Sequence, residues 1–230
     1  MEDSRDIKLS YTEKGEGFPL ILLHGNGENG EYFVRQTEYF SANYRVIAVD
    51  TRGHGKSPRG TAPFSIRQFA EDLRCFMDEL NIEKANILGF SDGGNIAMLF
   101  ALKYPERVER LILNGANLNA KGVKFSVQLP IEIGYRIASL FAKKSDGAKK
   151  NAEMLGLMVN DPNVEAAELA KIKARTLVIA GTKDMIKDKH TKLIYHSLPN
   201  AKLVILEGDH FIANKQAADF NREVKAFLNE

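Results

Sequence analysis

The stretch Ile87-Leu88-Gly89-Phe90-Ser91-Asp92-Gly93-Gly94-Asn95 decides the fold. An apolar run, residues 85–90, leads directly into it, and a helix-like apolar segment follows. The pattern Gly89-x-Ser91-x-Gly93 is typical of a tight strand-to-helix turn, where a Cβ atom on either glycine would clash with a neighbouring element. Such a turn holds the serine hydroxyl at the C-terminal edge of a sheet, above a helix N-terminus. Taken alone, the pattern is also compatible with a glycine-rich turn that carries a solvated serine.

Length and composition indicate one large domain with a possible small insertion. The chain has 230 residues and a net charge of +2, from 32 basic and 30 acidic side chains. This balance predicts neither a nucleic acid nor a membrane as partner. The single cysteine, Cys75, excludes an internal disulfide framework and a multi-cysteine metal site. We find no apolar run of membrane-spanning length and no signal-peptide pattern, so a cytoplasmic protein is expected.

Short apolar runs alternate with helical patterns along most of the chain. This alternation predicts an α/β fold, with a doubly wound, mostly parallel sheet of seven or eight strands flanked by helices. Ser65 and Gln68 form a capping box at the start of the clearest helix. The strands are expected at residues 7–12, 19–23, 44–50, 85–90, 108–114, 175–180 and 202–206, and the helices at 31–40, 65–80, 95–104, 188–197 and 212–228.

The rhythm is interrupted between residues 117 and 173, where no buried strand is recognisable. We therefore expect a core of residues 1–116 and 174–230, and a helical lid of residues 117–173 with helices at 129–141, 147–159 and 164–171. The lid leaves the sheet at the edge that carries Ser91. Its apolar side chains are candidates for a substrate pocket, although such a stripe also occurs in protein cores: Phe125, Leu129, Ile133, Ile137, Leu140 and Met158. Residues 121–150 carry seven basic and two acidic side chains, compatible with a solvated face or with recruitment of an anionic substrate.

A serine hydroxyl becomes a good nucleophile only with a base that accepts its proton and an acid that orients the base. His210 follows the last predicted strand directly and is the best candidate base. Asp184 follows the strand at 175–180, and the order serine, aspartate, histidine is the one this kind of fold uses. Asp188 and Asp209 remain alternatives for the acid.

Five motifs in this order resemble the α/β-hydrolase superfamily over essentially the whole chain. They are His24-Gly25-Asn26-Gly27, Asp50-x-Arg52-Gly53-His54-Gly55-x-Ser57, Gly89-Phe90-Ser91-Asp92-Gly93-Gly94, Gly181-Thr182-Lys183-Asp184 and Gly208-Asp209-His210. The resemblance implies Ser91 as nucleophile, His210 as general base and acid, and Asp184 as the orienting acid. It also implies an oxyanion hole made by the backbone N–H groups of Asn26 and Asp92, with no metal and no cofactor.

The leading hypothesis is a serine hydrolase that acts on a small ester or related acyl compound through an acyl-enzyme. Thioesterase, amidase, carbon–carbon bond hydrolase and perhydrolase activities remain alternatives on the same triad, as does a ligand-sensing protein with little turnover. His24, His54 and Arg52 are interpreted as structural, and Phe90 as packing beneath the turn. The Asp92 side chain either has a structural, helix-capping role or faces the pocket and favours a cationic substrate. The sequence does not decide between a monomer and a homo-oligomer.

Overall fold

Within residues 6–230, which the computed structural model describes, seven strands form one sheet in the order β1-β3-β2-β4-β5-β6-β7. All neighbouring strands run parallel except β1, which is antiparallel to β3. The predicted fold class is thus confirmed, with seven strands. They are β1 (Tyr11–Lys14), β2 (Pro19–Leu23), β3 (Arg45–Val49), β4 (Ala85–Phe90), β5 (Val108–Asn114), β6 (Arg175–Gly181) and β7 (Ala201–Leu206).

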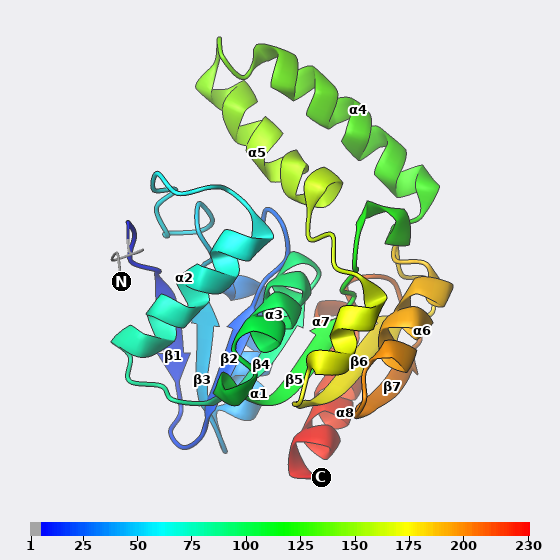
Figure 1. Cartoon of the computed structure of the whole chain (residues 1–230). Helices are drawn as coiled ribbons and strands as arrows, with labels where there is room; N and C mark the ends of the chain where they lie inside the picture. The colour runs from blue at the N-terminus through cyan, green and yellow to red at the C-terminus, as the bar shows by residue number, and fades with distance from the viewer. Residues whose placement is uncertain (1–5) are drawn as a thin grey trace.

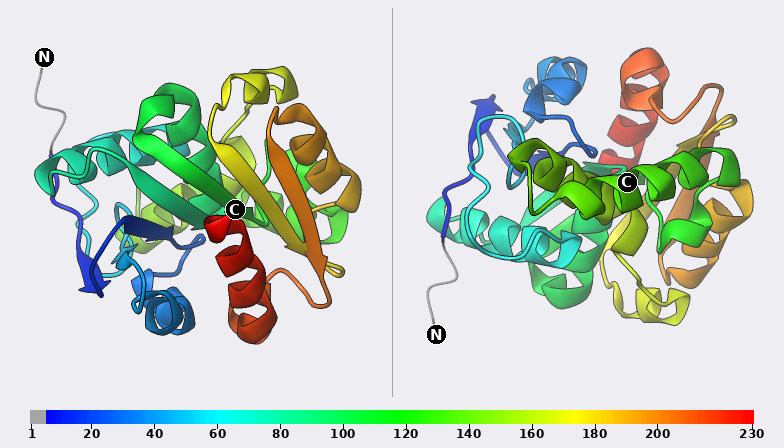
Figure 2. Two further views of the ribbon diagram at one scale, coloured as in Figure 1. Left: turned by 90° about the horizontal axis from the view of Figure 1, so that it is seen from below. Right: turned by 90° about the horizontal axis from the view of Figure 1, so that it is seen from above.

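Helices cover both faces of the sheet, and each face has its own apolar core (Figure 2). Strand β2 shows why, because Ile21 and Leu23 enter one core while Leu20 and Leu22 enter the other. One face is covered by α2 (Ile66–Glu79), α3 (Asp92–Lys103), η4 (Ala166–Lys171) and α6 (Asp188–Ser197), and the other by η1 (Gly30–Phe33), α1 (Val34–Phe40), α7 (Ile212–Lys215) and α8 (Ala217–Asn229). Two short 3₁₀ turns, η2 (Pro105–Arg107) and η3 (Ala120–Gly122), lie before and after β5.

Two helices, α4 (Phe125–Phe141) and α5 (Asp146–Asn160), form a hairpin that projects from one end of the core (Figure 1). The segment that follows α5 does not project with the hairpin but packs back on the core. Leu169 and Ile172 are fully buried in the core that also holds α2 and α3. The third helix expected in the lid is instead the 3₁₀ turn η4.

The structure shifts two predicted starts by four residues, and it divides the helix predicted at 212–228 into α7 and α8. Strand β1 begins at Tyr11 rather than at residue 7, because the Ser10 N–H donates to the Ser57 hydroxyl at 2.8 Å and not to a strand. Helix α4 begins at Phe125, although Pro130 lies inside it. Pro130 leaves the Ser126 carbonyl without its helical donor, and because Ser126 is exposed, that carbonyl remains open to water.

Residues 1–5 lie outside the described residues, and with them most of the polar segment on which the expectation of no signal peptide is based. Among the helices formed by residues 6–230, none combines the length and the low charge needed to cross a bilayer.

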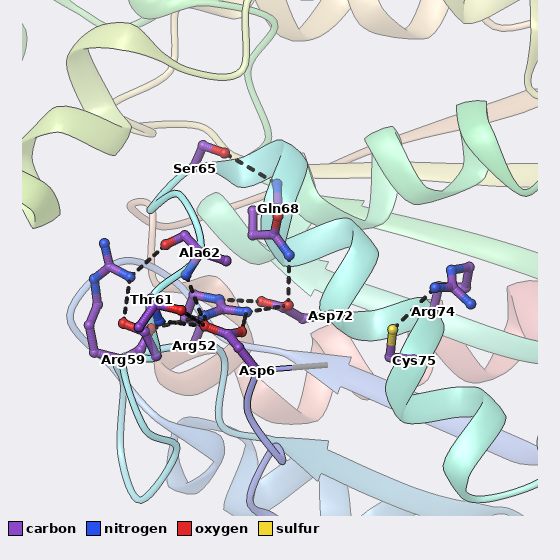
Figure 3. A network of polar contacts seen from close by, with 11 residues as sticks. Asp6, Arg52, Arg59, Thr61, Ala62, Ser65, Gln68, Asp72, Arg74 and Cys75 are labelled. Atoms are coloured by element: carbon purple, nitrogen blue, oxygen red, sulfur yellow. Dashed lines mark hydrogen bonds and ion pairs between the residues drawn. The ribbon is translucent and has the colours of Figure 1, made fainter. Parts of the chain in front are cut away.

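The loop after β3 is held by the buried guanidinium of Arg52 (Figure 3). Arg52 donates to both carboxylate oxygens of Asp72 on α2 at 2.6 and 2.7 Å, and to Asp6 at 2.7 Å. Its third side-chain nitrogen donates to the carbonyl of Arg59 at 3.0 Å. The contacts confirm the structural role predicted for Arg52, since they join the chain start, this loop and α2.

We expect Arg52→Met to lower the free energy of unfolding by about 3–5 kcal/mol, because it leaves the buried Asp72 carboxylate uncompensated. Urea denaturation followed by circular dichroism measures the loss. Arg222→Met is the matched control, since Arg222 pairs with Asp219 in an exposed position. Equal denaturation midpoints for the two variants would contradict the role assigned to Arg52.

Candidate active site

The serine turn has the strained geometry that its glycines suggest. Ser91 has φ 53° and ψ −119°, a backbone conformation that residues other than glycine rarely adopt. A Cβ atom on Gly89 would lie 2.2 Å from the Gly93 carbonyl oxygen, and one on Gly93 would lie 2.0 Å from the Leu23 carbonyl oxygen. The Ser91 N–H donates to the Asn114 carbonyl at 2.8 Å, which ties the turn to the end of β5. Ser91 therefore stands at the junction of β4, α3 and β5.

The structure brings His210 and Asp184 into contact. The Nδ1 atom of His210 lies 2.7 Å from Oδ1 of Asp184, and both side chains are buried. Because Nδ1 faces a carboxylate, we assign the proton to Nδ1, which leaves Nε2 as an acceptor. Within the described residues, His210 Nε2 and Asp184 Oδ2 are buried and have no hydrogen-bond partner. Such unsatisfied buried atoms are unusual and call for an explanation.

Neither alternative acid occupies the position of Asp184. Asp188 is exposed at the start of α6, where it pairs with Lys192 at 2.9 Å. The Asp209 carboxylate accepts the Phe211 N–H at 2.9 Å and pairs with Lys215. Asp184 is therefore the carboxylate that contacts the His210 ring.

Gly115, which follows β5, leaves the space that the His210 ring occupies. A Cβ atom at this position would lie 2.6 Å from Cε1 and 2.9 Å from Nδ1 of His210. Gly115 also has φ +63°, which favours glycine. This role of Gly115 is not recognisable in the sequence, because a glycine after a strand has many explanations.

Asn26 links the serine turn to the hairpin. Its side-chain amide donates to Oδ2 of Asp92 at 2.9 Å and to the carbonyl of Met154 on α5 at 2.9 Å. Asn95 donates more weakly to Oδ1 of Asp92, at 3.4 Å. Burial raises the pKa of Asp92 to about 6, against the opposing effect of the Asn26 hydrogen bond. The Asp92 side chain thus has structural contacts, made with amide side chains and not with helix N–H groups.

Glu28 is a half-buried carboxylate that the sequence analysis missed. It accepts the Gly25 N–H at 3.1 Å, which shapes the loop that carries Asn26. Burial raises its pKa, and the nearby His210 lowers it. Phe90 stacks on Tyr32 with 4.5 Å between ring centroids and lies 4.8 Å from the His210 ring, so its predicted packing role is confirmed.

His24 and His54 hold loops, as predicted. His24 accepts the Thr51 N–H on Nε2 at 3.0 Å, and its Nδ1 lies 2.7 Å from the Gly25 carbonyl. These two contacts require the neutral ring, and burial lowers the pKa of His24 to about 4. The Nδ1 atom of His54 lies 2.9 Å from the Arg52 carbonyl.

The pocket candidates lie on the hairpin. Five of them are on α4 and are 40–76% exposed, and Met158 on α5 is half-buried. The five on α4 are Phe125, Leu129, Ile133, Ile137 and Leu140. The contacts within the structure do not test their predicted pocket role, which stays a prediction. Among residues 6–230, no group of three or more histidine, cysteine or acidic side chains is arranged to hold a metal ion.

Comparison with known proteins identifies the family. Residues 19–130 match the model of the alpha/beta hydrolase fold family. A 2-hydroxy-6-oxononadienedioate/2-hydroxy-6-oxononatrienedioate hydrolase from Burkholderia vietnamiensis is 31% identical, over 99% of this chain and 93% of its own length. The chain belongs to the α/β-hydrolase fold family. The resemblance inferred from its motifs is confirmed.

Solved structures of other α/β-hydrolases agree with this assignment. A meta-cleavage product hydrolase from Pseudomonas fluorescens is 27% identical, with a TM-score of 0.78 over 97% of this chain and 94% of that chain. An enol-lactonase from Burkholderia xenovorans has a TM-score of 0.83 over 98% of both chains, and its 24% identity supports the fold alone.

The raised pKa of Asp92 predicts a pH-dependent stability. A carboxyl whose folded pKa lies above its unfolded value of 3.8 favours the folded state when protonated, and this stabilisation is lost as the pH rises through about 6. Relative to Asp92→Asn, the wild type should therefore lose about 3 kcal/mol of unfolding free energy between pH 4 and pH 7. Urea denaturation of both proteins across this range measures the difference, and parallel curves would contradict it.

Proposed function

We propose that this α/β-hydrolase cleaves a small carboxylic ester through an acyl-enzyme formed on Ser91. The observation that carries the proposal is the buried contact of 2.7 Å between Asp184 and His210, which leaves the second ring nitrogen of His210 as an unpaired acceptor. A serine on a strained strand-to-helix turn is the complementary group, because its hydroxyl must lose a proton to become a nucleophile.

The reaction proceeds in two halves. The Ser91 oxygen attacks the ester carbonyl while its proton moves to Nε2 of His210, and the imidazolium is stabilised by Asp184. When the tetrahedral intermediate collapses, the bond to the alcohol oxygen breaks and His210 returns the proton to that oxygen. A water molecule then gives a proton to His210 and attacks the acyl carbonyl. The bond from the acyl carbon to the Ser91 oxygen breaks, His210 returns the proton to that oxygen, and the carboxylic acid leaves.

Two backbone N–H groups are proposed as the oxyanion hole. Asp92 is the first residue of α3, so its N–H has no acceptor within the helix. Asn26 lies in the loop after β2, and its side chain bonds to Asp92. In comparable sites, each such donor stabilises the transition state by about 3 kcal/mol.

We expect Ser91→Ala to lower kcat for p-nitrophenyl esters at least about a thousandfold, because the nucleophile is removed. Wild type and variant are assayed in parallel over increasing acyl chain length. A fluorophosphonate probe should add one adduct by mass spectrometry to the wild type and none to Ser91→Ala. Ser197→Ala, at the end of α6, is the control that should keep both the activity and the adduct.

Equal ester hydrolysis by the wild type and Ser91→Ala would contradict the proposal. Absence of turnover in both proteins, together with tight and saturable ligand binding, would instead favour a sensing role.

Carbon–carbon bond hydrolysis is the second candidate. It is favoured by the names of two relatives, the Burkholderia vietnamiensis hydrolase at 31% identity and the meta-cleavage product hydrolase at 27% identity. The same two proteins are therefore assayed with a 2-hydroxy-6-oxo-2,4-dienoate, whose conjugated chromophore disappears on cleavage. A kcat/KM above that for every ester, lost in Ser91→Ala, would select this activity.

The acid is tested by a pair of substitutions. Asp184→Asn should lower kcat about ten-thousandfold, because an amide at this position favours the wrong His210 tautomer. Asp209→Asn should stay close to the wild type, since the Asp209 carboxylate bonds to Phe211 N–H and Lys215. Equal losses in the two variants would contradict the proposed role of Asp184. Thermal unfolding of each variant shows that the fold is retained.

A further inference from the structure

Helix α4 carries a continuous apolar surface that the rest of the described chain leaves uncovered. Six of the twelve large hydrophobic side chains that are exposed among residues 6–230 lie on this one helix, with exposed fractions of 40–76%. Their spacing of three to four residues places them on one side of the helix, over a length of about 24 Å. We name this surface the α4 stripe; its members are Phe125, Leu129, Ile133, Ile137, Leu140 and Phe141.

The hairpin orients the α4 stripe away from the catalytic core. The opposite side of α4 packs on α5, where the Leu155 side chain lies beside Gly134 and the Tyr135 ring beside Gly156. Helix α5 in turn faces the core, because Glu153 on α5 forms a bidentate ion pair with Arg59, in the loop after β3, at 2.8 and 3.0 Å. In the right-hand view of Figure 2, which looks down on the hairpin end of the molecule, α4 (green) lies in front of the core.

Cations surround the α4 stripe at both ends. Seven basic and two acidic side chains lie between residues 121 and 150, although the whole chain has a net charge of only +2. In the part of the chain that the structure describes, none of the seven basic side chains forms an ion pair, and all are exposed. Lys121 and Lys124 lie before α4 and Lys143 and Lys144 after it, so these four flank the stripe, and Arg136 lies within α4. Lys149 and Lys150 lie on α5 and are not part of the surface, since the pKa of His54 in the core is lowered by burial and also by Lys150.

This charge distribution distinguishes between possible occupants. A second copy of the chain would bury the α4 stripe, but both ends of the stripe are basic. An antiparallel pairing would bring Lys124 of one copy close to Lys143 of the other, and a parallel pairing would bring each lysine close to its equivalent. Both arrangements repel, whereas an anionic lipid surface satisfies the apolar stripe and the cations together.

We propose that the α4 stripe and its flanking lysines form a docking surface for an anionic lipid bilayer. The axis of α4 lies in the membrane plane, the apolar side chains enter the headgroup boundary, and the lysines contact anionic headgroups. The core then remains in water on the far side of α5. This conclusion departs from the expectation of no membrane partner, because the near-neutral whole-chain charge conceals the basic hairpin.

The test is vesicle flotation of the full chain with phosphatidylcholine vesicles, either alone or mixed with phosphatidylglycerol. We expect binding to the mixed vesicles, little binding to the neutral ones, and release as salt is raised. Lys143→Glu/Lys144→Glu should weaken partitioning at least about tenfold, from the loss of two surface cations. Leu140→Ser/Phe141→Ser should weaken it at least about tenfold through lost apolar burial.

Matched substitutions elsewhere on the surface serve as controls. Lys189→Glu/Lys225→Glu changes two exposed lysines, and Val34→Ser/Leu193→Ser changes two exposed apolar side chains. Both control variants should partition like the wild type. Ser91→Ala should also bind unchanged, so this result does not depend on the proposed hydrolase activity. Unfolding midpoints of the hairpin variants should match the wild type, because their side chains are exposed.

Three outcomes would overturn the proposal. The first is no binding of the wild type to the mixed vesicles. The second is equal binding to neutral and mixed vesicles. The third is a wild-type dimer by light scattering that Leu140→Ser/Phe141→Ser converts to a monomer, which would assign the stripe to a second copy.

Discussion

The close approach of α3 to strands β2 and β4 is the constraint on which the site depends. At Gly89 and Gly93, backbone atoms occupy the space that a Cβ atom would need, at 2.2 and 2.0 Å. This packing forces the reversal at Ser91, whose backbone conformation costs about 1–3 kcal/mol. The cost is offset by the sheet, because β4 is buried throughout, β2 is buried from Leu20 to Leu23, and Ser91 is itself hydrogen-bonded to the end of β5. The packing of α3 on β2 and β4 therefore maintains the strained backbone at Ser91, which the loop sequence alone would not maintain.

The same edge of the sheet gathers polar side chains into two kinds of environment. Some are saturated with hydrogen bonds, such as Arg52 with its three carbonyl and carboxylate partners and His24 with both ring nitrogens bonded. Others are buried and have an atom without a hydrogen-bond partner; within the described residues these include Nε2 of His210, Oδ2 of Asp184 and Nε2 of His54. Saturated groups stabilise the loops, whereas an open acceptor at a buried histidine is what proton transfer from a substrate-facing hydroxyl needs. An unpaired ring nitrogen alone does not separate His210 from His54. The partner of the other ring nitrogen does, because Nδ1 of His210 contacts the Asp184 carboxylate whereas Nδ1 of His54 lies against the Arg52 carbonyl.

The sequence predicts the strands well because a buried parallel strand is a continuous apolar run, as at β2 and β4. It also predicts that Ser91, Asp184 and His210 share one edge, because each follows a strand. It does not predict the contact of Asn26 with Asp92 or with Met154, which join residues 66 and 128 positions apart. Such contacts depend on side-chain directions that local patterns do not encode. The predicted start of this helix at residue 129 was four residues late for a related reason, since exposure of Ser126 decides whether the helix tolerates Pro130 in its interior.

Hydrophobic periodicity identifies which residues share a face of α4, but not what that face meets. The sequence therefore left both a core and a pocket open for these side chains, and the structure adds that the opposite side of α4 packs on α5 while the stripe is exposed. That packing also shows how the hairpin is attached. Asn26 holds α5 through the Met154 carbonyl, and Arg59 holds it through Glu153. The backbone N–H of Asn26 is also a proposed oxyanion donor, so a displacement of the hairpin would move the loop that carries this proposed donor. Position of the hairpin and catalytic geometry are thus coupled through one amide side chain.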